Sequence, residues 1–440
     1  MAWKAVLPTK GWSFEGRAQV NGRRVVVATD SFKGSISATA VAAALGAGWR
    51  SVRPGDDVVC IPMADGGEGT LEAVARAVPR ARWMPLTVRG PVGREVAASW
   101  LWVPPAAGAA DAGAGARADA DTRGGEWADS HRGGTAVVEL ASTSGIEHLR
   151  GRLRPLDAGT GGLGEAIAAA LRHGVERVVV GLGSSASTDG GAGMLTALGA
   201  RFLDAAGRPI RPGGRGLADL AAADLAGLAP LPPGGVIALS DVPNPLFGPD
   251  GAAAIFGPQK GATAVDVAAL DAGLVRFADV LGRSRGAVAR SADPAAPGAG
   301  AAGGTGYGLL AWGAALRPGA PAVAELLGLS AAVAGASIVI TGEGAFDAQS
   351  AAGKVPALVA ALAEAAHVPA ALVAGHIARG ADLGRFAHAE SLTALAGGAE
   401  GALADPARWL RRAGATLARA AFGAEAGTAP GPAPAPNPRG

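Results

Sequence analysis

One pattern of local sequence recurs four times along the chain: a short run of β-branched residues, a glycine-rich polar string and an alanine-rich stretch. The runs predict strands and the stretches predict helices, the first of which begins at Ala38 and ends near Gly48. Apolar strands that alternate with helices are typical of a parallel sheet covered on both faces. Because ligands bind beyond the carboxyl ends of such strands, the polar strings are predicted to form the site. The predicted strands span residues 24–29, 58–62, 177–181 and 337–341.

The length of 440 residues exceeds what one hydrophobic core usually supports, so we expect two domains. The formal net charge is only +2 and the arginines are scattered, which gives no reason to expect a nucleic-acid partner. Cys60 is the only cysteine, which excludes an internal disulfide and fits a reducing compartment. The N-terminus lacks an apolar targeting core, and no run of about 18 apolar residues follows. We therefore expect a soluble cytoplasmic protein with no membrane partner.

Several segments differ in composition from the rest of the chain. Residues 1–22 show no periodic pattern and predict an N-terminal extension. Residues 104–134 predict a low-complexity loop, and residues 424–440, rich in proline and alanine, predict a disordered tail. The glycine-rich residues 297–306 precede a predicted helix, which favours an anion-binding loop at a helix N-terminus.

Lysine is rare in this chain, since its 39 basic residues comprise five lysines and 34 arginines. Three of the five, Lys33, Lys260 and Lys354, lie in glycine-studded strings. A compact ammonium beside flexible main chain suits a point contact to phosphate, so these three are candidate phosphate-binding residues. The alternative is that they lie near some of the 70 glycines by chance.

Asp189 lies in a string of glycine and hydroxyl residues after the predicted strand 177–181, and Ser184 and Ser185 lie in the same string. A carboxylate among hydroxyls and flexible main chain resembles a phosphate cradle, and we expect it to point into an open mouth at the end of the strand. The alternative is a solvated turn in which Asp189 caps the next helix.

Paired carboxylates mark the string after the predicted strand 58–62. Asp65 and Glu68 flank Gly66 and Gly67. Oxygen ligands of this kind suit Mg²⁺ that is held partly through water. The alternative is helix N-capping by Asp65 with an acidic first turn.

Two further polar strings follow predicted strands. Asp241 and Asn244 lie in a loop that two prolines hold rigid, and a purely structural turn is an equal alternative there. The second string gathers more polar side chains than a turn requires. Upstream of Lys354 it contains Glu343, Asp347, Gln349 and Ser350. The six histidines show no metal-ligand spacing.

Taken in order along the chain, six strings resemble those of the bacterial glycerate kinase family. They extend from about Arg24 to Ala421, and six separate motifs in the family's order are not expected by chance. The strings comprise residues 30–38, 62–70, 189–194, 244–249 with 256–262, 298–304, and 340–350.

The resemblance implies an ATP-dependent kinase of D-glycerate, in the branch that generally forms 2-phosphoglycerate, with ATP and Mg²⁺ as cofactors. It also implies a two-domain α/β fold. A flavodoxin-like parallel-sheet domain would comprise residues 23–85 and 290–423, and a second α/β domain, residues 86–289, would be inserted between them. The oligomeric state is not specified, and a homodimer is left open.

Phosphoryl transfer needs in-line positioning, cations on the γ-phosphate and an acceptor for the hydroxyl proton. Asp189 is the candidate base or Mg²⁺ ligand, Lys33 and Asp65 are the other candidate catalytic residues, and Glu68 is a second candidate metal ligand. The candidate substrate- and phosphate-binding residues are Asp30, Ser31, Ser35, Gly66, Gly67, Glu68, Ser184, Ser185, Asp241, Asn244, Lys260, Gly342, Glu343, Gly344, Asp347, Gln349 and Lys354.

The chain departs from the family pattern at several positions. Ser184 and Thr188 stand where the family usually has glycine and asparagine. Residues 159–162 replace a string that usually contains two threonines and a tyrosine. Pro243 replaces the second aspartate of the Asp241 string, so no metal role can pass to that position.

Two other functions fit the same strings. A kinase of another small hydroxy or sugar acid would use the same loops. A non-catalytic regulator that binds a sugar acid is a weaker alternative, because a pure anion binder gains nothing from carboxylates beside its lysines.

Overall fold

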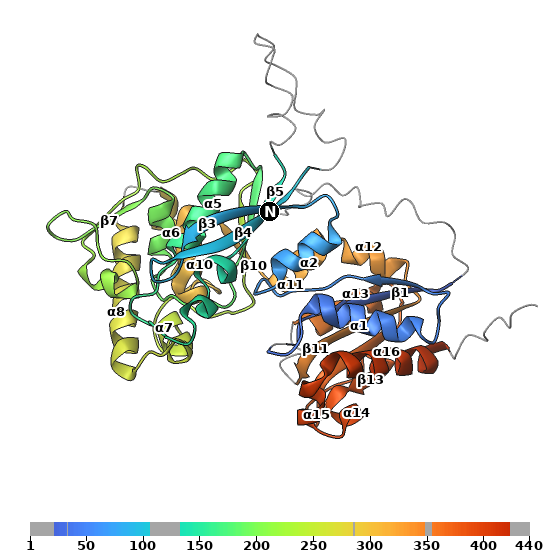
Figure 1. Cartoon of the computed structure of the whole chain (residues 1–440). Helices are drawn as coiled ribbons and strands as arrows, with labels where there is room; N and C mark the ends of the chain where they lie inside the picture. Colours follow the sequence, from blue (N-terminus) through green and yellow to red (C-terminus); the bar gives the residue numbers. More distant parts are fainter. Residues whose placement is uncertain (1–21, 33, 106–132, 285–286, 348–353, 423–440) are drawn as a thin grey trace, which may run out of the picture. The chain divides into compact units, whose positions relative to one another are not determined.

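The computed structural model describes residues 22–32, 34–105, 133–284, 287–347 and 354–422 (Figure 1). The predicted tail, nearly all of the predicted N-terminal extension and most of the predicted loop 104–134 lie outside the described residues. The chain divides into two compact units. Unit 1 comprises Met1–Ile61 with Ser330–Gly440, and unit 2 comprises Pro62–Leu329.

Unit 1 contains a five-stranded parallel sheet. Numbered along the chain, its strands lie in the order 2-1-3-4-5, which is the flavodoxin-like order. Val25, Val26 and Val27 are all buried, and since successive strand residues point to opposite faces, both faces of the sheet are covered. The strands are β1 (Arg24–Thr29), β2 (Asp57–Cys60), β11 (Ile338–Phe346), β12 (Ala370–Ile377) and β13 (His388–Ser391).

Two helices of unit 1, α1 and α16, pack with their backbones in close contact (Figure 1). A Cβ atom on Gly48 would lie 2.0 Å from the carbonyl oxygen of Arg411, and one on Gly414 would lie 2.2 Å from that of Leu45. Glycine at both positions therefore permits the helix spacing. The helices are α1 (Ala38–Arg50), α12 (Leu329–Ala334), which begins at the unit boundary, α13 (Val355–Ala365), α14 (Leu392–Ala396), α15 (Ala399–Ala404) and α16 (Pro406–Phe422).

Unit 2 contains a six-stranded mixed sheet in the order β10-β9-β6-β5-β4-β3. Its four strands from β10 to β5 are parallel, and an antiparallel hairpin, β3 with β4, extends the sheet at one edge. A separate two-stranded ribbon pairs β7 with β8. The strands are β3 (Arg82–Arg89), β4 (Glu95–Val103), β5 (Thr135–Glu139), β6 (Arg177–Gly181), β7 (Arg201–Leu203), β8 (Ala222–Asp224), β9 (Val236–Leu239) and β10 (Ala315–Arg317).

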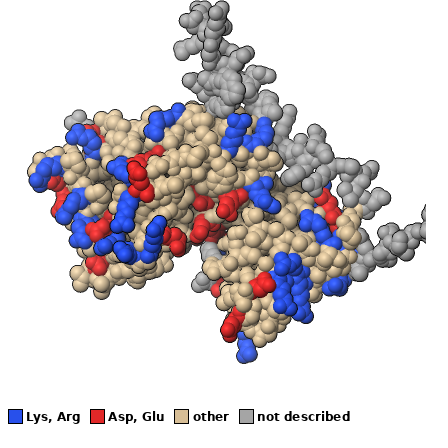
Figure 2. Space-filling view, viewed as in Figure 1, with Lys and Arg blue, Asp and Glu red and all other residues tan. Residues whose placement is uncertain are grey.

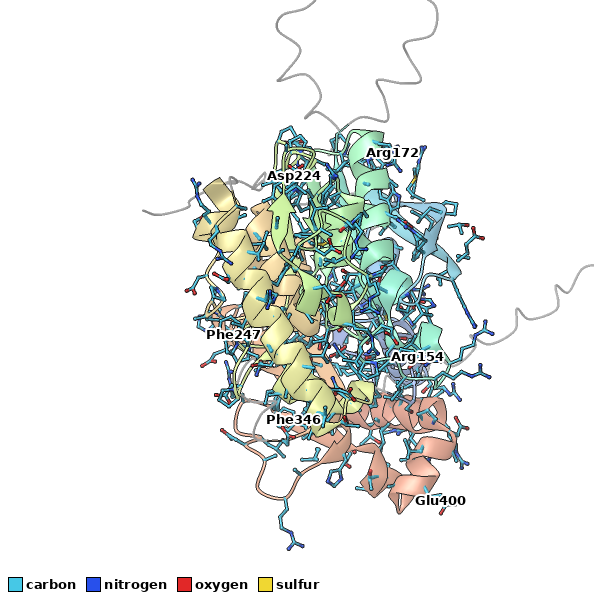
Figure 3. All side chains as sticks on the ribbon, turned by 90° about the vertical axis from the view of Figure 1, so that its left-hand side faces the viewer. Arg154, Arg172, Asp224, Phe247, Phe346 and Glu400 are labelled. Atoms are coloured by element: carbon cyan, nitrogen blue, oxygen red, sulfur yellow. The ribbon has the colours of Figure 1, made fainter. Side chains whose placement is uncertain are left out.

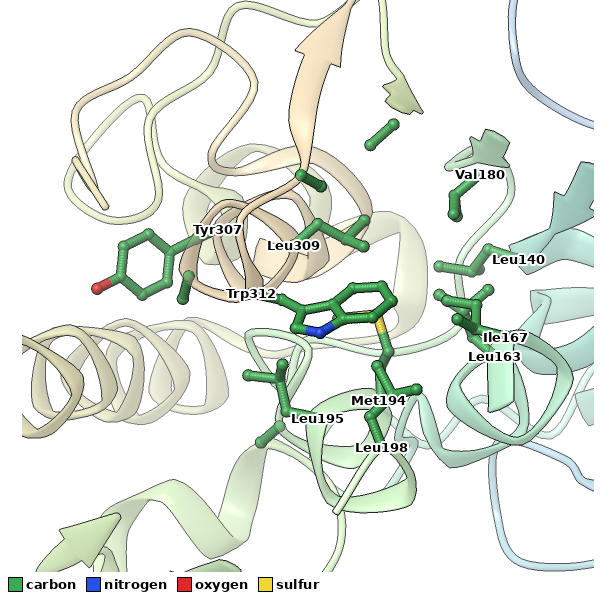
Figure 4. Packing of buried hydrophobic residues seen from close by; sticks show 14 of the residues in the cluster. Leu140, Leu163, Ile167, Val180, Met194, Leu195, Leu198, Tyr307, Leu309 and Trp312 are labelled. Atoms are coloured by element: carbon green, nitrogen blue, oxygen red, sulfur yellow. The ribbon is translucent and has the colours of Figure 1, made fainter. Parts of the chain in front are cut away.

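The core of unit 2 lies between this sheet and its helices. Trp312 packs beside Met194 and Leu195 and donates its indole N–H to the carbonyl oxygen of Ala229 at 2.8 Å (Figure 4). The helices are α2 (Thr70–Ala77), α4 (Leu140–Ser144), α5 (Gly161–His173), α6 (Ala192–Ala197), α7 (Ala252–Phe256), α8 (Ala264–Gly282), α9 (Ala287–Ser291), α10 (Ala301–Trp312) and α11 (Gly319–Leu326).

The longest helix of unit 2 has a complete capping box. Thr263 accepts from the main-chain N–H of Asp266, whose carboxylate accepts from Thr263 in return. Further along α8, Asp271 accepts from the main-chain N–H of Gly248 at 2.9 Å. This bond holds the loop that carries Phe247 beside the helix (Figure 3).

The predicted two-domain α/β fold with parallel sheets is confirmed, and the predicted strands 24–29 and 177–181 coincide with β1 and β6. The predicted domain boundaries at 85 and 290 differ from the unit boundaries. Residues 62–85 belong with unit 2 because β3 pairs with β4 along its whole length, and residues 290–329 do so because β10 pairs with β9. No helix among the described residues is long and apolar enough to cross a membrane.

Candidate active site

In unit 1 the candidate residues gather at the carboxyl ends of β1 and β11. The strand order reverses between these two strands, which is where ligands bind in sheets of this type. The main-chain N–H of Asp30 donates to the carbonyl oxygen of Gly342 at 2.9 Å, so the strings 30–38 and 340–350 meet there. Asp30 and Glu343 are both buried. Two carboxylates predicted from separate strings therefore lie on adjacent strands.

Two buried hydroxyls accompany these carboxylates, and sequence reasoning missed both. Thr29 and Thr341 are fully buried, and their side-chain oxygens have no hydrogen-bond partner among the described residues. Buried polar groups are nearly always paired in proteins, so hydroxyls of this kind mark positions where water or a ligand group can bind. The sequence offers one indication of both threonines, because each ends a predicted strand and lies next to a polar string.

The other candidates of unit 1 lie nearby or outside the described residues. Ser31 is half-buried and donates its main-chain N–H to the Asp30 carboxylate, whereas Ser35 is exposed in the turn before α1. Gly344 belongs to β11, and Asp347 is the first residue after that strand. Lys354 is exposed and is the N-cap residue of α13, but its side chain makes no capping hydrogen bond. Lys33 and Gln349 lie outside the described residues.

In unit 2 the string with Asp65 and Glu68 folds over the carboxyl ends of β6 and β9. Gly66 has φ +88°, and a Cβ on it would lie 2.6 Å from the Cβ of Leu239. A Cβ on Gly183 would lie 2.4 Å from the Cα of Gly67. A Cβ on Gly181 would likewise lie 2.5 Å from the carbonyl oxygen of Gly66. The absence of side chains at these four glycines therefore allows the backbones of the two loops to pack against each other. The Asp65 string follows β2 of the sheet in unit 1, yet it lies over the ends of β6 and β9 in the sheet of unit 2.

Asp241 belongs to the same edge, and Asn244 does not contribute its side chain there. Asp241 is exposed, and its carboxylate accepts from the main-chain N–H of Gly319 at 2.8 Å, at the start of α11. A Cβ on Gly319 would lie only 1.8 Å from the carbonyl oxygen of Asp65, so the Asp65 and Asp241 loops are neighbours. Asn244 donates its side-chain amide to the carbonyl oxygen of Asp250, which is the bonding of a structural turn.

Asp189 is fully enclosed, in contrast to the expectation of an open mouth. One carboxylate oxygen accepts from the main-chain N–H of Gly191 at 3.2 Å. The other accepts from the main-chain N–H and the hydroxyl of Thr160, both at 2.9 Å, and from the main-chain N–H of Gly193 at 3.1 Å. Burial raises the pKa of Asp189, and these four donors oppose the rise. The carboxylate joins the N-termini of α5 and α6 to its own loop.

Thr160 is a third residue that sequence reasoning did not single out. Its hydroxyl accepts from the main-chain N–H of Met194 at 2.9 Å, so its proton points to Asp189. The sequence offered one indication of Thr160, which is its position in the string 159–162, where the chain departs from the family pattern. Thr160 and Asp189 therefore act as one buried unit.

Lys260 is also buried, rather than exposed to an incoming phosphate. Its ammonium donates to the hydroxyl of Ser185 at 2.8 Å and to the carbonyl oxygen of Ser187 at 2.6 Å. Burial lowers the pKa of Lys260 to about 7, and the Asp189 carboxylate opposes this shift. In this structure Lys260 braces the string 183–189, and its phosphate contact stays a prediction.

The glycine-rich residues 297–306, predicted to form an anion-binding loop at a helix N-terminus, pack into unit 2. Ala302, Gly303 and Gly304 all have positive φ and interrupt α10. A Cβ on Gly303 would lie 2.0 Å from the carbonyl oxygen of Ser187, and the carbonyl of Gly303 accepts from Gly190. This segment therefore packs directly against the backbone of the loop that contains Asp189.

Ser184 adopts a left-handed conformation with φ +59°, which explains why glycine suits this position. Its side chain is exposed, so removing it sacrifices no buried contact. Ser184→Gly is expected to raise the free energy of unfolding by about 0.5 to 1 kcal/mol, measured by urea titration. Ser185→Gly is the control, expected to destabilise because it removes the acceptor of Lys260. A Ser184→Gly variant less stable than the parent would contradict the strain argument.

On the face in Figure 2, lysine and arginine side chains form several separate groups, and aspartate and glutamate side chains lie between some of them. Among the described residues no group of three histidine, cysteine, aspartate or glutamate side chains is arranged to hold a metal ion. The acidic edge of unit 2 is thus not a preformed metal cage.

The fold and its loops define a two-domain α/β protein with polar, glycine-rich strings at the carboxyl ends of its parallel strands, a class to which many phosphate-handling enzymes belong. The model of the glycerate kinase family matches residues 25–421. The chain therefore belongs to the glycerate kinase family, and it is an enzyme of the kinase class.

Individual relatives agree with the family match. The chain is 41% identical to a glycerate kinase of Bacillus subtilis, with 81% of this chain and 86% of that protein covered. It is 39% identical to the glycerate 2-kinase of Escherichia coli, with 80% and 85% covered. A crystal structure of a protein described as glycerate kinase 2 from Salmonella typhimurium LT2 superposes with a TM-score of 0.72 at 36% identity, covering 91% of this chain and 98% of that one.

Proposed function

We propose that this chain transfers a phosphoryl group from ATP to D-glycerate and forms 2-phosphoglycerate. The observation that carries the proposal is the match over residues 25–421 to a family in which relatives 39% to 41% identical are named glycerate kinase and glycerate 2-kinase. The reaction is proposed for the cytoplasm, where ATP is abundant.

The residues of the acidic edge suit a Mg²⁺ ion that arrives with the nucleotide. Asp65 is half-buried, and Glu68 and Asp241 are exposed on the same unit. Mg²⁺ is usually held by one or two carboxylates together with waters and substrate phosphates, so a complete protein cage is not required. When bound, the ion would neutralise charge on the phosphate oxygens. Asp189 is not proposed as a ligand, because four protein donors already occupy its oxygens.

The protein groups have separate tasks in this proposal. The Asp30 and Glu343 carboxylates at the switch point of unit 1 orient hydroxyl groups of a substrate. Lys354, at the N-terminus of α13, offers an exposed ammonium and a helix dipole to phosphate. In unit 2, Asp189 with Thr160 and Lys260 keeps the string 183–189 in place.

The proposal is tested by incubating the protein with MgATP and D-glycerate and following ADP. Phosphorus and carbon NMR of the product then separates the 2-phosphate from the 3-phosphate. L-glycerate, glycolate and D-lactate serve as competing acceptors. ADP formation that depends on D-glycerate, with phosphate on carbon 2, is the expected result. Faster turnover with another acid would favour the alternative of a different hydroxy-acid kinase, and absence of ADP with every acid would contradict the proposal.

A further inference from the structure

Glu139 is a buried carboxylate that lies outside the predicted polar strings and has no part in the proposed reaction. It is the last residue of β5, in the middle of the sheet of unit 2, and only 6% of it is exposed. Its side chain accepts from the main-chain N–H of Leu71 at 2.8 Å, and the main-chain N–H of Thr70 also favours its charged form. These are the first two residues of α2. A carboxylate from one strand thus binds the start of a helix 68 residues away in sequence.

The start of α2 depends on this remote group. Its N-cap residue is Gly69, with φ 90°, and glycine has no side chain with which to cap the helix. The first N–H groups of a helix have no partner inside the helix, and an acidic side chain at that end also interacts favourably with the helix dipole. Glu139 therefore supplies from the sheet the cap that the local sequence lacks.

Placing a carboxylate there is costly for the fold. Burial raises the pKa of Glu139 to about 7, and the nearby carboxylates of Glu68 and Glu72 push the pKa in the same direction. The remainder of β5 from Ala136 to Val138 is fully buried and apolar, and an apolar residue would continue the strand without this cost. Unlike an apolar residue, the carboxylate can bind the main chain at the start of α2, and it thereby fixes the position of the preceding loop.

That chain is the loop with the predicted metal-binding residues. Gly67 accepts from the hydroxyl of Thr70 at 2.8 Å and donates to Asp65 at 3.1 Å. The bond from Leu71 to Glu139 thus lies one residue from the Thr70 bond that shapes the turn around Asp65. β5 pairs with β4 on one side and with β6 on the other, so this connection ties the loop to a strand that is held at both edges.

We propose that Glu139 is a positioning residue for the reaction, holding the loop 65–69 in its working geometry by capping α2 from the end of β5. The expected loss of kcat/KM rests on the proposed kinase function, whereas the expected change in hydrogen exchange at the start of α2 does not. Glu139 touches no reacting atom in this account and acts through the loop alone.

Glu139→Gln is the main test, because glutamine keeps the shape and one acceptor oxygen but loses the charge. Glu165→Gln is the matched control, since Glu165 also accepts a main-chain N–H from a distant strand, that of Arg89 at 2.7 Å, away from this loop. Hydrogen exchange of peptides covering residues 65–75 measures the loop position without any substrate. Faster exchange at residues 70 and 71 is expected in Glu139→Gln alone, with kcat/KM for MgATP about tenfold lower at about pH 8.

The pH dependence separates positioning from a general loss of stability. Protonated Glu139 loses one acceptor, so parent activity should decline as the pH falls through about 7, whereas Glu139→Gln should be flat between about pH 6 and about pH 8. Glu139→Asp retains the charge on a shorter side chain and should show the same faster exchange, which keeps the test open if the glutamine variant does not fold.

Three results would overturn the inference. They are unchanged exchange at residues 70 and 71, faster exchange with unaltered kinetics, and an identical response in Glu165→Gln. If the parent protein does not phosphorylate D-glycerate at all, the proposed function fails, while the exchange measurement still decides whether Glu139 holds the loop.

Discussion

Asp189→Asn is expected to lower the free energy of unfolding by about 3 kcal/mol and kcat by about 100-fold. The four groups that point at this carboxylate are all donors. An asparagine must turn its NH₂ group toward either Gly191 or the Thr160 and Gly193 pair, so at least one buried N–H would face another donor. The string 183–189 then loses the anchor that fixes it to α5 and α6, and turnover falls with it.

Urea unfolding and steady-state kinetics, both normalised to folded protein, measure this result. Asp204→Asn is the control, because Asp204 also accepts main-chain N–H groups, from Ala206 and Arg208, but in a surface turn. Its unfolding midpoint and kcat should be close to those of the parent. Normal stability with a large loss of kcat in Asp189→Asn would instead return Asp189 to the role of catalytic base that the sequence suggested.

The sequence predicted most accurately the buried strands that are followed by polar, glycine-rich strings. The β-branched runs predicted β1 and β6 to the residue, because three consecutive valines in each favour a buried strand. The stacking of the Asp65 string on the string 183–189 was not predicted, because the two strings follow strands of different sheets, β2 and β6, and glycines allow their backbones to approach closely.

What the sequence could not show is which polar side chains turn inward. Asp189 and Lys260 lie in glycine-rich strings predicted to face a ligand, and Glu139 ends a strand, yet all three side chains are buried. Their partners, such as Thr160 for Asp189 and Leu71 for Glu139, are 29 and 68 residues away and depend on the tertiary fold. The unit boundaries were missed for a similar reason, since only strand pairing reveals that β3 and β10 extend the sheet of unit 2.

Lys260→Met is expected to remove a pH dependence of stability that the parent protein shows. Burial lowers the pKa of Lys260 to about 7 from 10.5, so between these values the unfolded chain binds more protons than the folded one. The free energy of unfolding should therefore rise with pH in this window, by about 1 kcal/mol per pH unit, or about 3 kcal/mol from about pH 7 to about pH 10. Methionine retains the buried stem but cannot titrate, so its profile should be flat.

Urea titrations at intervals across this window measure the slope. Lys354→Met is the control, because Lys354 is exposed at the start of α13 and its replacement should leave the slope of the parent intact. Lys260→Met should also lower kcat, since Ser185 and the carbonyl of Ser187 lose the group that holds them, and the kinetics are compared at a pH where both proteins are folded. A parent slope that persists in Lys260→Met would mean that another group titrates. In that case the ammonium of Lys260 is accessible to solvent or ligand, as its first interpretation as a phosphate contact requires.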